Sequence, residues 1–338
     1  MSRPFIFLFV LLLAGCDGCS GGRERAIDIS GVEVEIPIER LDQHLFHAHP
    51  DSLPQASSEA RNKFGGFYRI YVEDILQGAP VDDPRLPLVL KRFVSDQDWS
   101  TVQEAIDSVF ANMAPEQRDF EQAFRRLKAV HPDSLVPRII TFNSGFNYGI
   151  FPTDSVLGVG LEWFIGSEHP VIGMLAPEAF PQYVKERMQP QMLVPSAVKG
   201  WLLVHYMPDV QGADLLAHLV ATGKVMALLD ALLPDVQLHL KMAFTPDQLA
   251  WCEANEFNIW KEIVNNEMLY SKKPADIGRL MNDGPFTNGF PRESPGHIGE
   301  WIGYRMVRSY MEENKNIGYT ELFSIEDPKE ILKFYKPK

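Results

Sequence analysis

The spacing of apolar residues predicts a mainly helical chain. Apolar side chains recur every three or four positions in three early stretches, residues 64–76, 99–113 and 120–130. Residues 198–207 continue this pattern, and residues 213–233 are apolar on nearly every face, which predicts a long buried helix. Helix starts with a capping residue or a proline occur at Pro115, Thr245-Pro246, Ser294-Pro295 and Asp327-Pro328.

Strand patterns are fewer and shorter. Residues 32–38 alternate between apolar and polar, which predicts a half-buried strand. Residues 138–142 and 156–165 are rich in β-formers, and residues 143–149 between them contain two glycines and favour a turn. We therefore expect an α+β fold: one helix-dominated body with a small, mainly antiparallel sheet.

The first residues have the plan of a bacterial lipoprotein signal. Arg3 precedes an apolar run at 5–13, and the small residues Ala14-Gly15 stand directly before Cys16. This order predicts a signal peptide at 1–15, acylation of Cys16, a lipidated tether at 16–26 and a globular domain at 27–338. An ordinary signal peptide that happens to contain a cysteine is the alternative. The apolar run is shorter than the roughly 20 residues of a spanning helix.

The signal places the body outside the cytoplasm, on the periplasmic side of a membrane in the cell envelope. No other segment is expected to cross the bilayer, so the lipid is the only predicted membrane contact. The net charge of −13 repels phosphate backbones, so no nucleic acid partner is expected. Cys19 and Cys252 are expected to be unpaired thiols, because one lies beside the anchor and the other within a helix.

Several polar residues are candidates for chemistry, although each has a simpler structural interpretation. His44, His47 and His49 could bind a metal, but exposed or capping histidines are the simpler reading. Glu162 is a candidate catalytic carboxylate or an edge-facing strand residue. Acid–base work is also conceivable for Glu253 with Glu256 and Glu262, which otherwise form a solvated helix face.

Two histidines on successive predicted helices have the layout of zinc-dependent peptidases. Those enzymes place two histidines four residues apart around a glutamate, with a third ligand on the next helix. Here Trp201 stands four residues before His205, and Thr222-Gly223 follows His218. Most of the ligands and the base are missing, so no catalytic residue, metal ligand or cofactor is predicted. Asp214 and His218 are four apart and are expected to form a structural ion pair or, alternatively, a dyad.

Several stretches resemble the gliding-motility lipoprotein B (GldB) family. The specific ones are Trp-Cys-Glu-x-Asn-Glu at 251–256 and Ser-Pro-Gly-x-Ile-Gly-x-Trp-Ile-Gly at 294–303. Weaker ones are 39–42, 141–146, Gly223-Lys224 and Leu233-Pro234, besides the sequence before Cys16. The likeness covers nearly all of the chain after residue 15.

The resemblance implies a membrane-attached component of gliding motility and of the associated protein-secretion machinery, with partners among the proteins of that machinery. It also implies a fold like a degenerate zinc-peptidase scaffold, without catalytic residues. Two other functions remain open. One is a divergent zinc metallopeptidase that uses His205 or His218, and the other is a module that binds an envelope peptide or glycan on the aromatic loop at 142–151.

Overall fold

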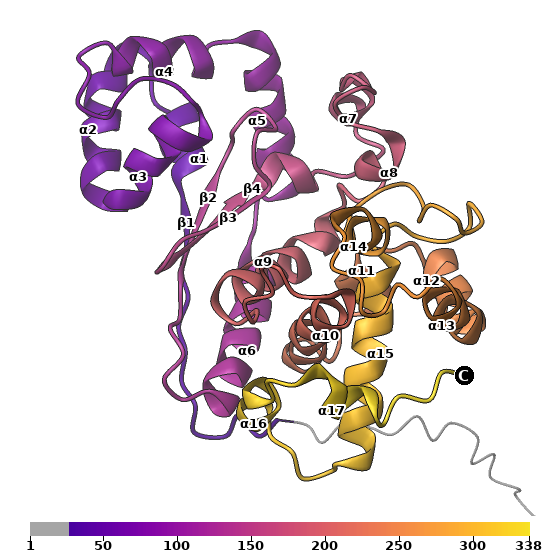
Figure 1. Ribbon diagram of the computed structural model, residues 1–338. Coiled ribbons are helices and arrows are strands. Elements are labelled where there is room, and N and C mark those ends of the chain that lie inside the picture. The colour runs from indigo at the N-terminus through magenta and orange to yellow at the C-terminus, as the bar shows by residue number, and fades with distance from the viewer. Residues whose placement is uncertain (1–26) are drawn as a thin grey trace, which may run out of the picture.

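A small sheet lies between two groups of helices. The computed structural model describes residues 27–338, and the predicted signal and tether, with Cys16 and Cys19, lie outside the described residues. Figure 1 shows the N-terminal helices on one side of the sheet and the larger C-terminal group on the other. Helices take up 56% of the described residues. The prediction of a helix-rich α+β body with a small sheet is confirmed.

The four strands are short and form one mixed sheet. They are β1 (Ile38–Arg40), β2 (Arg138–Phe142), β3 (Ile150–Pro152) and β4 (Val156–Gly160), in the order β1-β2-β4-β3. The β1–β2 and β2–β4 pairs are parallel, and only β3–β4 is antiparallel. The expectation of mainly antiparallel neighbours was therefore wrong. The helices between β1 and β2 supply the long crossover that a parallel pair requires.

The predicted strand at 32–38 is mostly not a strand. Only Ile38 belongs to β1, and the preceding residues bond to side chains of a helix rather than to another strand. Arg125 Nε donates to the carbonyl oxygen of Val32 at 2.7 Å, and the backbone N–H of Ile36 donates to Glu121 at 3.3 Å. The segment is thus fixed along one helix by two charged side chains.

The helices before β2 enclose a smaller core. These are α1 (Leu41–Phe46), η1 (Pro50–Ser52), α2 (Leu53–Phe64), α3 (Gly66–Ile70), the π-helix η2 (Tyr71–Ile75), α4 (Leu86–Val94), α5 (Gln97–Val109) and α6 (Ala114–Val130). Neighbouring residues of β2 point to opposite cores: Ile140 to the smaller one and Ile139 to the larger one. Gly158 in β4 lets the Phe67 ring lie directly on the sheet, because a Cβ there would be 2.5 Å from it.

The helices after β4 build the larger core. They are η3 (Leu161–Phe164), α7 (Pro170–Met174), α8 (Gln182–Lys185), η4 (Pro190–Met192), α9 (Leu193–His205), α10 (Leu215–Leu232), α11 (Leu238–Met242), α12 (Pro246–Ala254), α13 (Glu256–Asn265), α14 (Pro274–Met281), α15 (Ile298–Glu313), α16 (Tyr319–Ser324) and α17 (Pro328–Leu332). The predicted caps at Thr245 and Asp327 are confirmed, and Thr245 with Gln248 forms a full capping box.

Helix α10 is the buried centre of this group. Among the described residues it is the one helix long and apolar enough to cross a membrane, which the sequence analysis had not expected of any segment after the anchor. However, 83% of it is buried inside the body. Its composition is explained by contacts on all sides, in agreement with the buried helix predicted at 213–233.

Helices α10 and α15 cross at a distance that only glycine permits. A Cβ on Gly223 would lie 2.2 Å from the carbonyl oxygen of Gly303, and a Cβ on Gly303 would lie 1.9 Å from that of Leu219. Both obstacles are backbone atoms, which cannot rotate out of the way. The two helix backbones therefore touch directly at this crossing.

We expect Gly303→Ala to lower the free energy of unfolding by about 3 kcal/mol, because the added methyl group forces the two backbones apart. Gly173→Ala in α7 is the matched control, since nothing lies within 4 Å of its added Cβ, and we expect a change within about 0.5 kcal/mol. Urea unfolding of the purified proteins measures both. Equal midpoints for Gly303→Ala and the parent protein would contradict the backbone contact.

Candidate functional site

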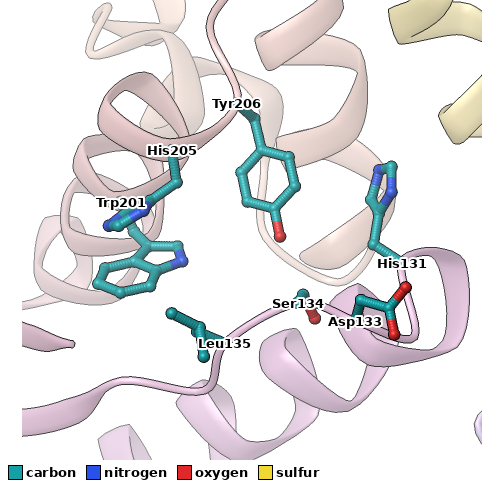
Figure 2. Close-up of a pocket in the computed structure, with 7 residues that line it drawn as sticks. All are labelled: His131, Asp133, Ser134, Leu135, Trp201, His205 and Tyr206. Atoms are coloured by element: carbon teal, nitrogen blue, oxygen red, sulfur yellow. The ribbon is translucent and has the colours of Figure 1, made fainter. Parts of the chain in front are cut away.

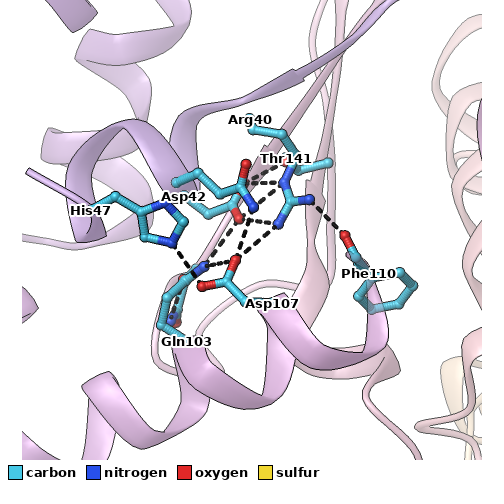
Figure 3. Close-up of polar contacts among 9 residues, drawn as sticks. Arg40, Asp42, His47, Gln103, Asp107, Phe110 and Thr141 are labelled. Atoms are coloured by element: carbon cyan, nitrogen blue, oxygen red, sulfur yellow. Dashed lines mark hydrogen bonds and ion pairs between the residues drawn. The ribbon is translucent and has the colours of Figure 1, made fainter. Parts of the chain in front are cut away.

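The carboxyl ends of the parallel strands bring buried polar side chains together. Arg40 ends β1 and pairs in register with Thr141 of β2, while Asp42 lies at the start of α1. Figure 3 shows the fully buried Asp42 accepting hydrogen bonds from Arg40 Nη2 at 2.7 Å and from Thr141 Oγ1 at 2.6 Å. Gln103 of α5 donates to the same carboxylate at 3.2 Å. With its acceptor positions filled, Asp42 joins β1, β2 and α5.

This network continues to the surface through Asp107. Partial burial would raise the pKa of the Asp107 carboxyl, but hydrogen bonds from Gln43 and His47 outweigh it, and the pKa is lowered. His47 reaches Asp107 at 2.8 Å. The other two histidines of the predicted cluster are bonded elsewhere: His44 to the carbonyl oxygen of Ala56, and His49 to the N–H of Asp51. The three rings have separate partners, as the structural interpretation predicted.

Glu162 is buried beside the same sheet edge. It lies in η3 directly after β4, so its placement in a strand and at an edge was wrong. Its Oε1 accepts three hydrogen bonds: from Ser144 Oγ at 2.5 Å, from Ser144 N at 2.7 Å and from Phe146 N at 3.2 Å. Its Oε2 has no partner. Burial raises the pKa of Glu162 to about 7, although the hydrogen bonds from Ser144 oppose this.

The loop that Glu162 fixes is strained. Gly145 and Phe146 both have a φ of +66°, a conformation that costs free energy for a bulky side chain such as Phe146. Ser144 and Glu162 would suit acid–base chemistry, but they are 1% and 0% exposed, so no substrate reaches them. The carboxylate holds the loop in its fold.

The aromatic residues of this loop mainly fill the core. Phe142 and Phe146 are buried, and the Phe146 ring packs against Trp163 and Phe180. Tyr148 is 37% exposed and its ring lies edge-on to Phe151. The stretch at 142–151 therefore offers at most one exposed ring to a ligand.

The predicted acidic set on the Trp251 helix has no common face. Glu253 is exposed, whereas Glu256 is buried and accepts from Arg305 of α15 at 3.2 Å. Glu262 pairs with Arg279 of α14 at 3.1 Å. The solvated face was wrong for Glu256, because α15 packs over it.

Asp214 and His218 do not form the predicted side-chain pair. Asp214 is the N-cap of α10, and its Oδ1 accepts from the N–H of Ala217 at 3.0 Å. Burial lowers the pKa of His218, and the charge of Asp214 only partly opposes this. Between the two side chains we find no ion pair or hydrogen bond.

His205 is bonded within the fold. Its Nε2 donates to the carbonyl oxygen of Thr153 at 3.1 Å, and its ring stacks on Trp201 with centroids 3.8 Å apart. Across residues 27–338, no three His, Cys, Asp or Glu side chains lie close enough to hold a metal ion. His205 and His218 therefore lack the further ligands that a zinc site needs.

A surface hollow lies beside His205. Figure 2 shows it between the end of α9 and the loop that follows α6. Its volume is about 300 Å³, and it is lined by His131, Asp133, Ser134, Leu135, Trp201, His205 and Tyr206. The sequence analysis did not single out the loop residues of this hollow, because they are brought to α9 only by the fold.

The comparison with known families decides the assignment. The model of the family described as gliding motility protein GldB matches residues 22–337. The chain belongs to the GldB family. No curated protein and no solved structure shows significant similarity to the chain.

The stretches that carry the GldB resemblance meet in the fold. Gly223 and Gly303 form the crossing of α10 and α15, and Gly299 packs on Leu219 in the same place. Next to Gly223, the buried Lys224 donates to the carbonyl oxygen of Ile325 at 2.6 Å, and burial lowers its pKa to about 8. Arg40, Asp42 and Thr141, from two other such stretches, form the network at the sheet edge. These GldB residues are explained by packing and internal bonding.

The pKa of Glu162 predicts a pH-dependent stability. Between pH 4.5, the ordinary value, and about 7, the folded protein holds a proton that the unfolded chain has lost. Stability therefore falls as pH rises through this window, by up to about 3 kcal/mol. We expect Glu162→Gln to remove this fall.

Urea unfolding at pH values from 5 to about 8 measures the effect. Glu253→Gln is the matched control, because Glu253 is exposed on α12, and it should keep the slope of the parent protein. If Glu162→Gln also keeps that slope, Glu162 is ionised throughout and the assigned proton is absent.

Proposed function

We propose that this GldB-family protein is a lipid-anchored, non-catalytic component of the envelope machinery for gliding motility and the associated protein secretion. Cys16 carries the lipid, and the acidic body stands on the periplasmic side of the membrane. The family match over residues 22–337 carries this proposal, together with the lipoprotein-type sequence before Cys16.

The non-catalytic role is supported by how the polar groups of the body are used. The groups that resemble catalytic sets are spent on the fold: Asp42 on Arg40 and Thr141, and Glu162 on the loop at Ser144. Both carboxylates are fully buried. A machine component needs a stable shape and a contact surface, and these bonds serve the first need.

The residues present do not fit a zinc-peptidase site. Trp201 stands where such a helix has its first histidine, and it is 1% exposed. Gly223, near the expected third ligand, packs against the backbone of Gly303. His205 donates to a carbonyl oxygen, which turns its Nε2 away from any metal. No observation favours the peptidase alternative over the proposed role.

The anchor is tested by Cys16→Ser. We expect the variant to leave the membrane fraction and to carry no acyl mass, because its hydroxyl does not replace the acylated thiol. Surface spreading and export of secreted proteins should fall to the level of a strain without the gene.

Cys19→Ser is the matched control, since it changes a neighbouring thiol and should keep anchoring, spreading and export intact. A Cys16→Ser protein that stays on the membrane with full spreading would overturn the anchor.

The non-catalytic role is tested by metal content. We expect gently purified protein to hold far less than one zinc ion per chain, and His218→Ala to leave that content unchanged. Elemental analysis by mass spectrometry measures it. A near-stoichiometric zinc content that His205→Ala or His218→Ala abolishes would instead establish the peptidase alternative.

A further inference from the structure

The hollow at the end of α9 contains polar atoms that the fold leaves unsatisfied. Eight buried side-chain N or O atoms in the described residues have no hydrogen-bond partner, and three of them belong to its lining: His131 Nε2, Ser134 Oγ and Trp201 Nε1. Leaving each such group unpaired costs about 1–3 kcal/mol. Their concentration on one hollow points to a ligand that supplies the partners.

The indole of Trp201 supplies a donor. The residue is 1% exposed, and Figure 2 shows its ring nitrogen on the side turned toward Ser134 and Tyr206. An indole N–H only donates, so its missing partner is an acceptor. The Ser134 hydroxyl slightly lowers the pKa of Tyr206, which burial raises, but it makes no hydrogen bond of normal geometry.

The ring of His131 supplies an acceptor. The Thr320 hydroxyl donates its one proton to the carbonyl oxygen of Val130 at 3.1 Å, so at 3.2 Å it must accept from His131 Nδ1. Burial lowers the pKa of His131, which keeps the ring neutral at pH 7. In that tautomer Nε2 carries a lone pair and no proton. The hollow thus offers one donor and one acceptor, the complement of a peptide group with its C=O and N–H.

The walls favour an uncharged ligand with an apolar side chain. No Lys or Arg lines the hollow, and Asp133 opposes an anion. Leu135 at its edge is 60% exposed, and Val204, which precedes His205 on α9, is 59% exposed. Such apolar side chains gain from being covered by another apolar group.

A glycan fits this hollow less well. Sugars bind on open aromatic faces, but the Trp201 ring is covered by His205 at 3.8 Å between centroids and meets the Phe124 ring edge-on at 6.1 Å. With its face occupied, Trp201 has only its N–H to offer.

We propose that this hollow binds a short extended peptide segment of a partner protein. A main-chain carbonyl of the segment accepts from Trp201 Nε1, a main-chain N–H donates to His131 Nε2, and an aliphatic side chain covers Leu135. This inference deepens the proposed function and rests on it, because it names the chemistry of the contact that a machine component makes.

The test uses the full-length lipidated protein in lipid nanodiscs and fluorescent heptapeptides with blocked ends. Each peptide carries one central residue in a Gly/Ser background, and fluorescence anisotropy measures affinity. We expect peptides with a central Leu or Ile to bind, and those with a central Asp or Lys to bind at least tenfold more weakly. N-methylation of the main chain should abolish binding, because it removes the N–H that His131 accepts.

Two variants and two matched controls locate the site. Trp201→Phe keeps the ring but loses the N–H, and Leu135→Ser removes exposed apolar surface without touching the core. Each should weaken binding roughly tenfold, which corresponds to about 1.4 kcal/mol. Trp260→Phe on α13 and Leu88→Ser on α4, where Leu88 is 54% exposed, should change nothing.

Absence of binding by every peptide, or equal binding by all four variants, would overturn the inference. So would preferential binding of a synthetic peptide with the sequence of residues 17–26, because the occupant would then be this chain's own tether. These failures leave the Cys16→Ser result untouched, so they are distinguishable from a failure of the proposed function. Peptide binding that Leu135→Ser abolishes, with spreading and export unchanged in that strain, would support the site and count against the function.

Discussion

The direct contact between the backbones of α10 and α15 is the constraint on which the rest of the larger core depends. Gly223 and Gly303 have no side chain to keep the helices apart, so each helix lies in the groove of the other. That closeness buries α10 on all sides and leaves its polar residues to find partners within the body. Lys224 reaches the carbonyl oxygen of Ile325, and Asp230 pairs with Lys241 and accepts from Tyr304 at 2.9 Å. These bonds fix the segments that surround α10.

The sheet has a comparable role at the boundary of the two cores. Three short strands could not hold so many helices by main-chain bonds alone. The buried pair of Arg40 and Asp42 adds side-chain bonds that reach β2, α5 and the carbonyl oxygen of Phe110. Because both charges are paired and bonded, their burial is tolerated, and removing either partner would leave an uncompensated charge.

Local patterns in the sequence were enough to locate most helices. Apolar spacing of three or four residues, Thr245 with Gln248, and Asp327 act within a few residues of chain, so they are readable without the fold. The start of α15 was not. Ser294-Pro295 reads as a helix start, yet α15 begins at Ile298, because Gly296 lies against the backbone of Gly284 and Thr287 Oγ1 donates to the carbonyl oxygen of Pro295.

The errors about the site have the same origin in long-range contacts. The strand directions depend on which segments become neighbours, and residues 32–37 lose their strand to Arg125 and Glu121 of α6. The burial of Glu162 depends on a loop 16–18 residues away, and that of Glu256 on Arg305 of α15. The hollow combines α6, its following loop and α9, so no local motif could announce it. The GldB resemblance identified residues that matter, but only the fold showed that they pack and bond internally.

The hollow and the proposed anchor are related through α6. From Ile29 onward the chain is bound to this helix, since Arg125 donates to the carbonyl oxygens of Ile29 and Val32 at 3.2 and 2.7 Å. His131 follows six residues after Arg125, about 9 Å along a helix axis. A tether of residues 16–26 spans at most roughly 40 Å when fully extended. An anchor at Cys16 therefore keeps the hollow near the membrane surface, where a partner segment must itself be membrane-associated or extended to reach it. Freedom in the tether is confined to residues before the body, so the partner meets a rigid surface and the ordering cost of binding falls on its own segment.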